Sequence, residues 1–379
     1  MSAETIFTNC TLVLPEESFT GSLLVRDGRI AEIDSSSSTR GIDLGGDVLM
    51  PGCVELHTDH LETHFQPRPK VRWNMEAALQ AHDGQIASSG ITTVFDALRV
   101  GLDGDTELGS ADMAAMAETI SAAEAAGRLR AEHFIHLRCE VSVPDVVERF
   151  DEISGNSRVR LASLMDHAPG QRQFVSLEAY RIYYQGKKKL SDVEFEAFSQ
   201  RRLADSALYS DRHRAMLAER CRAAGIAIAS HDDATADHVA EGITLGIALA
   251  EFPTTREAAT LSRAHGLQVL MGAPNVVRGG SHSGNVSALD LLADDALDIL
   301  SSDYVPFSLL QAVFLLAERG LMNLPAAVGL VTANPAEAAG LDDRGRIEIG
   351  RRADLIRVRT TPDRPPLVSG VWREGVRVC

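Results

Sequence analysis

The sequence predicts an α/β fold: a (β/α)8 TIM-like barrel with a small β-sandwich domain formed by both termini. Residues 51–339 alternate compact apolar segments with longer helical patterns, which is typical of parallel strands joined by crossover helices. Eight such units fit the size of a barrel. Residues 1–50 and 340–379 contain short alternating segments instead, so we expect the two ends of the chain to pair in a separate sheet-rich domain.

The N-terminal part of this small domain begins with three strand-like segments and a hairpin. Asp27-Gly28 between two alternating segments predicts a tight turn. The strand texture resumes after residue 344, and the segments concerned are 5–9, 22–26, 29–33, 345–350 and 353–358. The chain of 379 residues is 45% apolar, enough to bury one large domain beside this smaller companion.

Eight apolar segments are predicted as barrel strands: 53–57, 92–97, 134–139, 160–165, 226–230, 247–252, 268–271 and 298–302. Residues 111–126 form an Ala-rich helical pattern, and residues 192–224 are expected to be two helices broken near Ser210-Asp211. An open doubly wound sheet is the alternative. It is disfavoured because no Gly-rich dinucleotide fingerprint follows the first strand.

Charge and cysteine usage narrow the class of protein. The net charge of −16 argues against nucleic acid or an anionic membrane as a bulk partner. The five cysteines are scattered and contain no CxxC pair, so neither a disulfide framework nor a thiolate zinc site is predicted, and we expect a reducing cytoplasm. The N-terminus lacks a signal-peptide pattern, and no apolar run is long enough for a membrane span.

Polar residues stand at the carboxyl ends of the predicted strands, where barrel enzymes place their chemistry. The first strand ends in His57 and Asp59, which would share a face if both belonged to the strand. Imidazole and carboxylate ligands suit zinc, iron or manganese, so this edge predicts a metal site. The further polar residues are Asp96, Glu140, Asp166, His167, His231, Asp232, Asp233, Glu251 and Asp303.

This constellation resembles the amidohydrolase superfamily, whose barrel carries His-x-His after its first strand. The matching positions here are His57, Glu140, His167, His231 and Asp303, and Asp59 stands where the superfamily usually has its second His. The resemblance implies two divalent metal ions per chain, zinc with iron or manganese as alternatives. It places Glu140 between the ions, His57 and Asp59 on one, His167 and His231 on the other, and Asp303 on metal and nucleophile.

Longer motifs resemble a narrower group, the PhnM-type diphosphatases of phosphonate utilisation. The resemblance implies hydrolysis of α-D-ribose 1-methylphosphonate 5-triphosphate to the 5-phosphate and pyrophosphate in the carbon-phosphorus lyase pathway, with Asp303 as proton acceptor. By this strand count His167 and His231 follow the fourth and fifth strands, whereas the superfamily generally places them after the fifth and sixth. We therefore expect an additional short strand near residues 141–143. The motifs are HTDHLETH (57–64), PRPKV (67–71), AHD (81–83), GITTVFDA (90–97), SHDDAT (230–235), EFPTT (251–255), MGAPNVVRGGSHSGN (271–285) and SSDYVP (301–306).

A triphosphate requires cations and backbone donors, and the loop after the seventh strand offers both. It holds Arg278, Gly279, Gly280, Ser281 and His282, and consecutive backbone N–H groups in a Gly-rich turn can form an anion nest. The Gly-Lys-Ser/Thr ending of a Walker A loop is missing. A flexible Gly-Ser loop is the alternative interpretation.

Two other basic segments are candidates for substrate binding. Pro67 and Pro69 predict an extended backbone that would place Arg68 and Lys70 on one face, although solvated charge is the commoner explanation for such a run. Arg172 and Tyr180 belong to a third candidate set, which could hold phosphonate, ribose or phosphate through charge-assisted hydrogen bonds. Ordinary helix packing is the alternative for the tyrosine.

The function, the partners and the role of one polar segment stay open at the level of sequence. An ordinary amidohydrolase acting on a cyclic amide, or deaminating a heterocycle, would share the metal site, and a non-catalytic assembly protein of the pathway would share the fold. The partner we expect is the small-molecule ribosyl triphosphate, with a homo-oligomer or other phosphonate-pathway proteins as further possibilities. His60, Glu62 and His64 could bind substrate or a further ion, and we favour a supporting role beside the first ligands.

Overall fold

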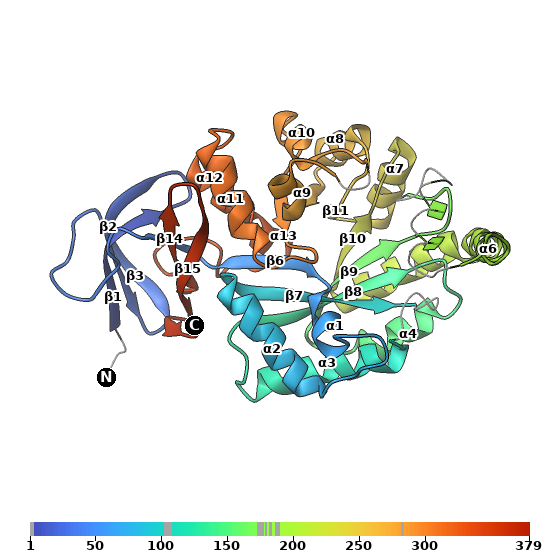
Figure 1. Cartoon of the computed structure of the whole chain (residues 1–379), viewed down its shortest axis with the longest axis horizontal. Coiled ribbons are helices and arrows are strands. Elements are labelled where there is room, and N and C mark those ends of the chain that lie inside the picture. Colours follow the sequence, from blue (N-terminus) through green and yellow to red (C-terminus); the bar gives the residue numbers. More distant parts are fainter. Residues whose placement is uncertain are drawn as a thin grey trace.

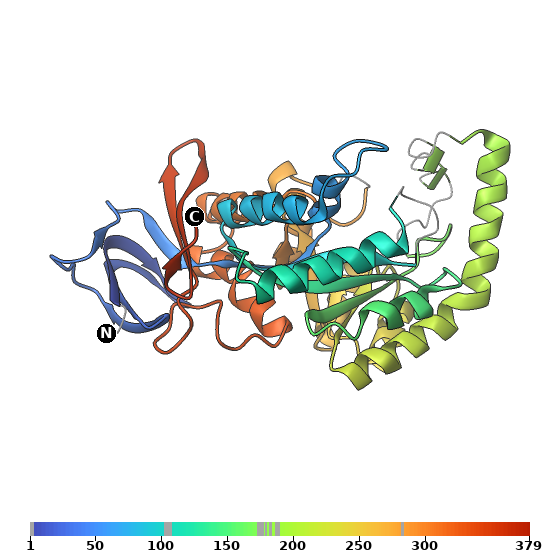
Figure 2. The same cartoon turned by 90° about the horizontal axis from the view of Figure 1, so that it is seen from below.

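The computed structural model describes residues 4–101, 108–172, 178, 180–181, 184–185, 190–281 and 284–379. The chain forms a barrel and, beside it, a sheet to which both termini contribute (Figures 1 and 2). This arrangement confirms the predicted fold class. The domain boundaries at residues 50/51 and 339/340 stay a prediction.

Eight parallel strands build the barrel, and each pairs with its neighbour in sequence order. An isolated parallel bridge between Thr58 and Asp303 joins the first strand to the segment after the last. Each predicted strand overlaps an observed one. The strands are β6 (Cys53–Thr58), β7 (Ile91–Val100), β8 (Glu132–Glu140), β9 (Val159–Met165), β10 (Ala227–His231), β11 (Leu249–Glu251), β12 (Gln268–Gly272) and β13 (Ile299–Ser301).

Helices surround the barrel and follow its strands (Figure 1). The apolar layer between strands and helices is one large cluster that includes Val94, Ile135, Leu217 and Leu309. Among the described residues, no helix combines the length and apolar character needed to cross a bilayer. The helices are α1 (His60–Phe65), α2 (Met75–Ser88), α3 (Ser110–Ala125), α4 (Val146–Ile153), α6 (Asp192–Ala224), α7 (Ala236–Leu245), α8 (Arg256–Ala264), α9 (Ala273–Arg278), α10 (Ala288–Ala293), α11 (Ser308–Glu318), α12 (Leu324–Gly329) and α13 (Ala333–Ala338).

Helix α6 is continuous over 33 residues, so the predicted break near Ser210-Asp211 is wrong. No Gly or Pro interrupts the helix, and the Ser210 hydroxyl donates to the buried Asp166 carboxylate at 2.7 Å instead of competing for the backbone. A capping box of Ser191 and Glu194 starts the helix, and Gly225 ends it in the left-handed conformation.

The expected extra strand near residues 141–143 is also wrong. These residues form a turn after β8, in which the Val143 N–H donates to the Glu140 carbonyl at 3.1 Å. The barrel already has its eight strands without it. His167 and His231 therefore follow the fourth and fifth strands, as the sequence count gave.

The terminal sheet is one continuously hydrogen-bonded unit. Strands β14 and β5 pair in antiparallel register, which joins the C-terminal hairpin to the N-terminal strands. Its core includes Phe7, Leu23 and Trp372, with Trp372 edge-on to Phe7 at 4.8 Å between ring centroids. The strands are β1 (Glu4–Val13), β2 (Ser18–Arg26), β3 (Arg29–Asp34), β4 (Ile42–Asp43), β5 (Val48–Pro51), β14 (Leu355–Thr361), β15 (Arg364–Arg373) and β16 (Val376–Arg377).

A fully buried charge network joins β7, β8 and α2. The Asp96 carboxylate accepts from His82 Nε2 and His133 Nδ1, both at 2.7 Å. Burial lowers the pKa of His133, but Asp96 and Asp83 together outweigh that effect and raise it to about 10. The imidazole of His133 is therefore cationic at neutral pH and pairs with the carboxylates of Asp83 and Asp96.

This network predicts a loss of stability at alkaline pH. Because the folded pKa of His133 lies above its unfolded value of 6.5, its contribution is complete below pH 6.5 and disappears as the pH rises toward 10. We expect the free energy of unfolding to fall by on the order of 1–3 kcal/mol across this window. Urea unfolding from pH 6 to 10 measures it.

The control for this prediction is a pair of variants. His133→Gln should flatten the pH dependence between neutral and alkaline pH, whereas His265→Gln, at an exposed position, should keep it. An equal slope in both variants would contradict the role given to His133.

Candidate metal centre and substrate cavity

The structure brings three of the predicted metal ligands together at the carboxyl ends of the strands. His57 from β6, His231 from β10 and Asp303 after β13 line one cavity, and Arg138 from β8 projects into the same space. Its further lining residues are Asp232, Phe252, Pro253, Met271, Gly272, Pro274, Asn275, Arg278, Gly280, Ser281, Asn285, Val286 and Tyr304.

Glu251 holds the first two histidines in one orientation. Its two carboxylate oxygens accept from Nδ1 of His57 and Nδ1 of His231, both at 3.2 Å. Burial is the main cause that lowers the pKa of each imidazole to about 3, so both are neutral at pH 7. A neutral imidazole with its proton on Nδ1 has a free lone pair on Nε2, which is the form that binds a metal.

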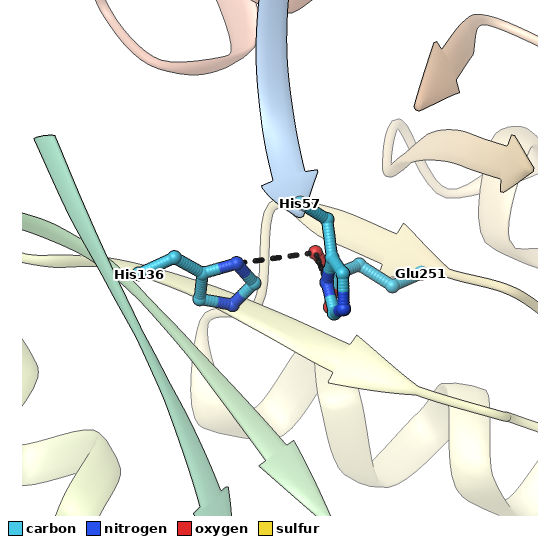
Figure 3. A group of neighbouring side chains, drawn as sticks. All are labelled: His57, His136 and Glu251. Carbon is cyan, nitrogen blue, oxygen red and sulfur yellow. Dashed lines mark hydrogen bonds and ion pairs between the residues drawn. The ribbon is translucent and has the colours of Figure 1, made fainter. Parts of the chain in front are cut away.

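Figure 3 shows His57 and Glu251 with a third buried imidazole, His136. Its Nδ1 lies 3.9 Å from the same Glu251 carboxylate. Both nitrogens of His136 have closer partners, the Leu56 carbonyl and the Ser163 hydroxyl, each at 3.0 Å. The ring packs edge-on against His57 at 4.9 Å between centroids, and His136 does not line the cavity.

His167, His231 and Asp232 form a group whose potential ligand atoms all lie within 4.8 Å of one another. Asp232 Oδ2 lies 3.7 Å from His167 Nε2 and 3.5 Å from His231 Nε2. This oxygen is buried and accepts no hydrogen bond among the described residues. A buried carboxylate oxygen beside two imidazole nitrogens fits a divalent transition metal.

Glu140, which the resemblance places between two ions, lies directly beside His167, and its bridging role stays a prediction. Its carboxylate accepts from His167 Nδ1 at 2.6 Å and from Arg202 at 3.0 Å, and also from Ser142. These neighbours hold its pKa well below the usual range despite burial. Glu140 is therefore in position to orient His167.

Glu140 and Asp232 also set the charge of His167. Burial opposes the cation, but these two carboxylates raise the pKa of His167 to about 10. In the absence of metal the ring carries a proton between its two partners. A metal ion binding at Nε2 would displace that proton.

Asp59 lies beyond the strand rather than on the strand face shared with His57. Strand β6 ends at Thr58, and Asp59 is the residue before helix α1. Its carboxylate pairs with Arg138 at 3.1 Å. The predicted common strand face is therefore wrong, although the Asp59 charge still acts on the site.

Asp303 has the properties of a base that works near neutral pH. It adopts a left-handed backbone conformation with φ of 54° immediately after Ser301 and Ser302. Burial, followed by the charge of Asp59, raises the pKa of its carboxyl group to about 7. It can therefore take up and release a proton at working pH.

The loop after β12 contributes its side chains but not the predicted anion nest. The N–H groups of Gly279 and Gly280 both donate to the Asn275 carbonyl, at 3.1 and 2.9 Å, and so close the C-terminus of α9. Their donors are not available to a phosphate. Arg278, Gly280 and Ser281 nevertheless line the cavity, and His282 lies outside the described residues.

A model of the amidohydrolase family matches residues 70–379. The chain belongs to the amidohydrolase family. The resemblance inferred from the motifs is thereby confirmed, and with it the expectation of a metal-dependent hydrolase.

One curated relative of this amidohydrolase is α-D-ribose 1-methylphosphonate 5-triphosphate diphosphatase from Escherichia coli K12. It is 48% identical over 379 residues, which cover 98% of this chain and 100% of the relative. This relative belongs to the narrower group that the longer motifs resemble.

Solved structures share the fold at much lower identity. N-acetyl-D-glucosamine-6-phosphate deacetylase from Mycobacterium smegmatis is 16% identical, with 99% of each chain covered and a TM-score of 0.65. The 5-methylcytosine deaminase from Klebsiella pneumoniae is 15% identical, with coverage of 99% of this chain and 98% of that one and a TM-score of 0.66. These likenesses support the architecture.

The basic segment at residues 67–72 does not reach the amidohydrolase cavity. It folds into a tight turn in which the Val71 N–H donates to the Arg68 carbonyl at 3.1 Å, and Lys70 has a φ of 63°. The predicted extended backbone is therefore wrong, because a turn reverses the chain at this point. Arg68 and Lys70 are exposed and neither lines the cavity.

Arg172 and Tyr180 also lie away from the cavity lining. Arg172 is buried and forms ion pairs with Asp233 and Glu241, which compensate its charge within the protein. Tyr180 is buried in an aromatic cluster with Tyr184, 4.4 Å away between centroids, and with Phe198. The packing alternative therefore describes Tyr180 better than a role in substrate binding.

Proposed function

We propose that this amidohydrolase hydrolyses α-D-ribose 1-methylphosphonate 5-triphosphate to the 5-phosphate and pyrophosphate, a step of phosphonate catabolism in the carbon-phosphorus lyase pathway. The observation that carries the proposal is the 48% identity to the Escherichia coli diphosphatase across 98% of the chain. The cavity supports it, because Arg138 and Arg278 line the same space as the candidate metal ligands. A triphosphate is the kind of substrate that such a combination of cations binds.

We propose two divalent ions per chain, with zinc preferred and iron or manganese as alternatives. His57, His167, His231 and Asp232 have the donor atoms to hold them, and Asp59 and Asp303 lie close enough to contribute their charges. When bound, such ions polarise phosphoryl oxygens and lower the pKa of water toward neutrality. Imidazole and carboxylate donors suit these metals, and no cysteine lines the cavity in the described part of the chain.

The protein's own groups supply the remaining steps in this proposal. Water attacks the α-phosphorus, Asp303 accepts the proton of the attacking water, and the α–β bridging oxygen departs with pyrophosphate. Arg278 lies at the end of α9 over the cavity, where its guanidinium can compensate the charge of the leaving group. The ion pair of Arg138 and Asp59 keeps a second guanidinium beside the site of attack.

Phosphorus NMR of the products tests this function directly. The full-length enzyme with added zinc, manganese or iron is incubated with the ribosyl triphosphate. Release of pyrophosphate together with the 5-phosphate supports attack at the α-phosphorus. Release of orthophosphate means that another bond breaks, and an absence of turnover with every metal overturns the proposal.

Arg278→Ala should distinguish a triphosphate substrate from an uncharged cyclic amide. The side chain is exposed, so the variant should fold normally. We expect the KM for the triphosphate to rise by about 10- to 100-fold, as for loss of one or two charge-assisted hydrogen bonds. Steady-state kinetics measure it, with Arg319→Ala, another exposed arginine at a helix end, as the matched control. Equal KM values in the two variants would favour a generic amidohydrolase.

Location and assembly belong to the same proposal. The five cysteines are free, four of them buried, which suits the reducing cytoplasm where a phosphonate-pathway enzyme would work. A homo-oligomer, or a complex with other proteins of the pathway, stays a prediction that light scattering of the purified chain would check.

A further inference from the structure

We propose that His60, His64 and Gln85, together with His82, form a second metal site for a divalent transition ion, separate from the catalytic cavity. The site joins helix α1 to helix α2, which pack side by side (Figure 1). None of the four residues lines the catalytic cavity. The proposal does not depend on the identity of the substrate.

His60 and His64 are four residues apart on α1 and therefore lie on one face of the helix. Their Nε2 atoms converge on a single atom, Gln85 Oε1 of α2, at 3.1 and 3.0 Å. One amide oxygen is thus the meeting point of two imidazole nitrogens from the neighbouring helix. Two histidines at this spacing are a common chelating pair, and the amide oxygen offers an additional donor.

A third imidazole, His82, lies one turn before Gln85 on α2 and is fully buried. Its Nε2 is bonded to the Asp96 carboxylate at 2.7 Å, while its Nδ1 is buried with no hydrogen-bond partner. A histidine that donates one ring nitrogen to a carboxylate and keeps the other free has the arrangement found in metal ligands. An unpartnered buried nitrogen is otherwise costly, and a metal ion would relieve that cost.

The spacing of the two rings on α1 agrees with one shared ion. Ring centroids are separated by 5.2 Å for His60 and His64, 5.7 Å for His64 and His82, and 6.2 Å for His60 and His82. With a metal–nitrogen bond of about 2.1 Å and tetrahedral angles, imidazole centroids around one zinc lie roughly 5 Å apart. The pair on α1 already has this separation, whereas His82 lies farther from both rings and must move toward them to share the ion.

The electrostatic setting also favours a cation over protons. Partial burial is the main cause that lowers the pKa of His60 and of His64, which favours the neutral form of the imidazole. The only acidic residue between them in sequence, Glu62, is paired with Arg99 instead. A bound ion would link α1 to α2 directly after Asp59, the residue that connects strand β6 to helix α1.

Metal content and affinity test the site in the full-length protein. Atomic emission after saturation with zinc gives the number of ions per chain, and titration with Co²⁺ gives affinities from its visible absorption. We expect wild type to bind one ion more than His64→Ala or His60→Ala. Each substitution should lower the affinity for that extra ion by at least about tenfold. His265→Ala, at an exposed position, should keep it.

Two results separate this site from the catalytic one. His231→Ala should lose hydrolytic activity and still bind the extra ion, whereas His64→Ala should lose the extra ion and the increase in Tm that zinc gives the wild type. Gln85→Leu removes the amide oxygen on α2 and should also weaken binding of the extra ion. Agreement between this variant and His64→Ala would show that the loss does not come from misfolding of one variant. Equal stoichiometry and equal Co²⁺ affinities in wild type and the His60, His64 and Gln85 variants would overturn the proposal.

Discussion

Asp303→Asn is expected to lower kcat by about three orders of magnitude while leaving the fold intact, because it removes the proton acceptor of the proposed reaction. The carboxyl group is isosteric with the amide, and Asn tolerates the left-handed backbone that Asp303 adopts at φ 54°. The substitution therefore changes the chemistry rather than the shape. Pyrophosphate release under saturating substrate and metal measures the effect.

The matched control is Asp363→Asn, because Asp363 also has a positive φ, of 59°, but is exposed in the turn between β14 and β15. It should retain full activity. Turnover of Asp303→Asn within a factor of a few of the control would rule out Asp303 as the base. Thermal unfolding of both variants shows whether a loss of activity is a loss of fold.

Glu251→Gln should have the second largest effect, through the orientation of the metal ligands rather than through chemistry. The carboxylate accepts from Nδ1 of both His57 and His231, whereas an amide has one accepting oxygen and one donating nitrogen. One of the two imidazoles must then carry its proton on Nε2, which blocks its lone pair. We expect metal affinity to fall by about 10- to 100-fold, the range typical of residues that orient metal ligands.

Activity measured against free zinc concentration checks this expectation. Glu251→Gln should be inactive at limiting zinc and recover part of its turnover with excess zinc, which a residue acting directly on the substrate would not do. Glu257→Gln, at an exposed position on α8, serves as the control. An unchanged zinc dependence would mean that Glu251 only fills the barrel interior.

The fold was predictable because its evidence is local and repeated. Each apolar segment between helical patterns became a barrel strand, and the hairpin at Asp27-Gly28 formed as the turn chemistry predicts. The break assigned near Ser210 failed for a reason that lies outside the segment. Its hydroxyl is used by Asp166 on another part of the barrel, and sequence alone does not reveal such a partner.

The site was predictable in its location but not in its pairings. The strand-end rule identified His57, His231 and Asp303, which do line one cavity. Asp232 was present in the same polar set, yet its position between His167 and His231 emerges only from the distances to their nitrogens. The run His-Asp-Asp after the fifth strand was the available signal.

Basic residues were the least predictable part of the site. The sequence gives their charge but not the carboxylates that neutralise it, so Arg172 and Arg278 looked equivalent. The fold buries the first between Asp233 and Glu241 and leaves the second over the cavity. Long-range ion pairs of this kind depend on which strand ends become neighbours.

The bridge between Thr58 and Asp303 makes the seam of the barrel part of its chemistry. On one side of the seam, the Glu55 carboxylate accepts from the Ser301 hydroxyl at 2.6 Å and from the Ser302 N–H at 2.5 Å. These are the residues that place Asp303. The last strand thus meets the first through the same contacts that position the Asp303 carboxylate, so closure of the barrel also fixes the geometry of the proposed base.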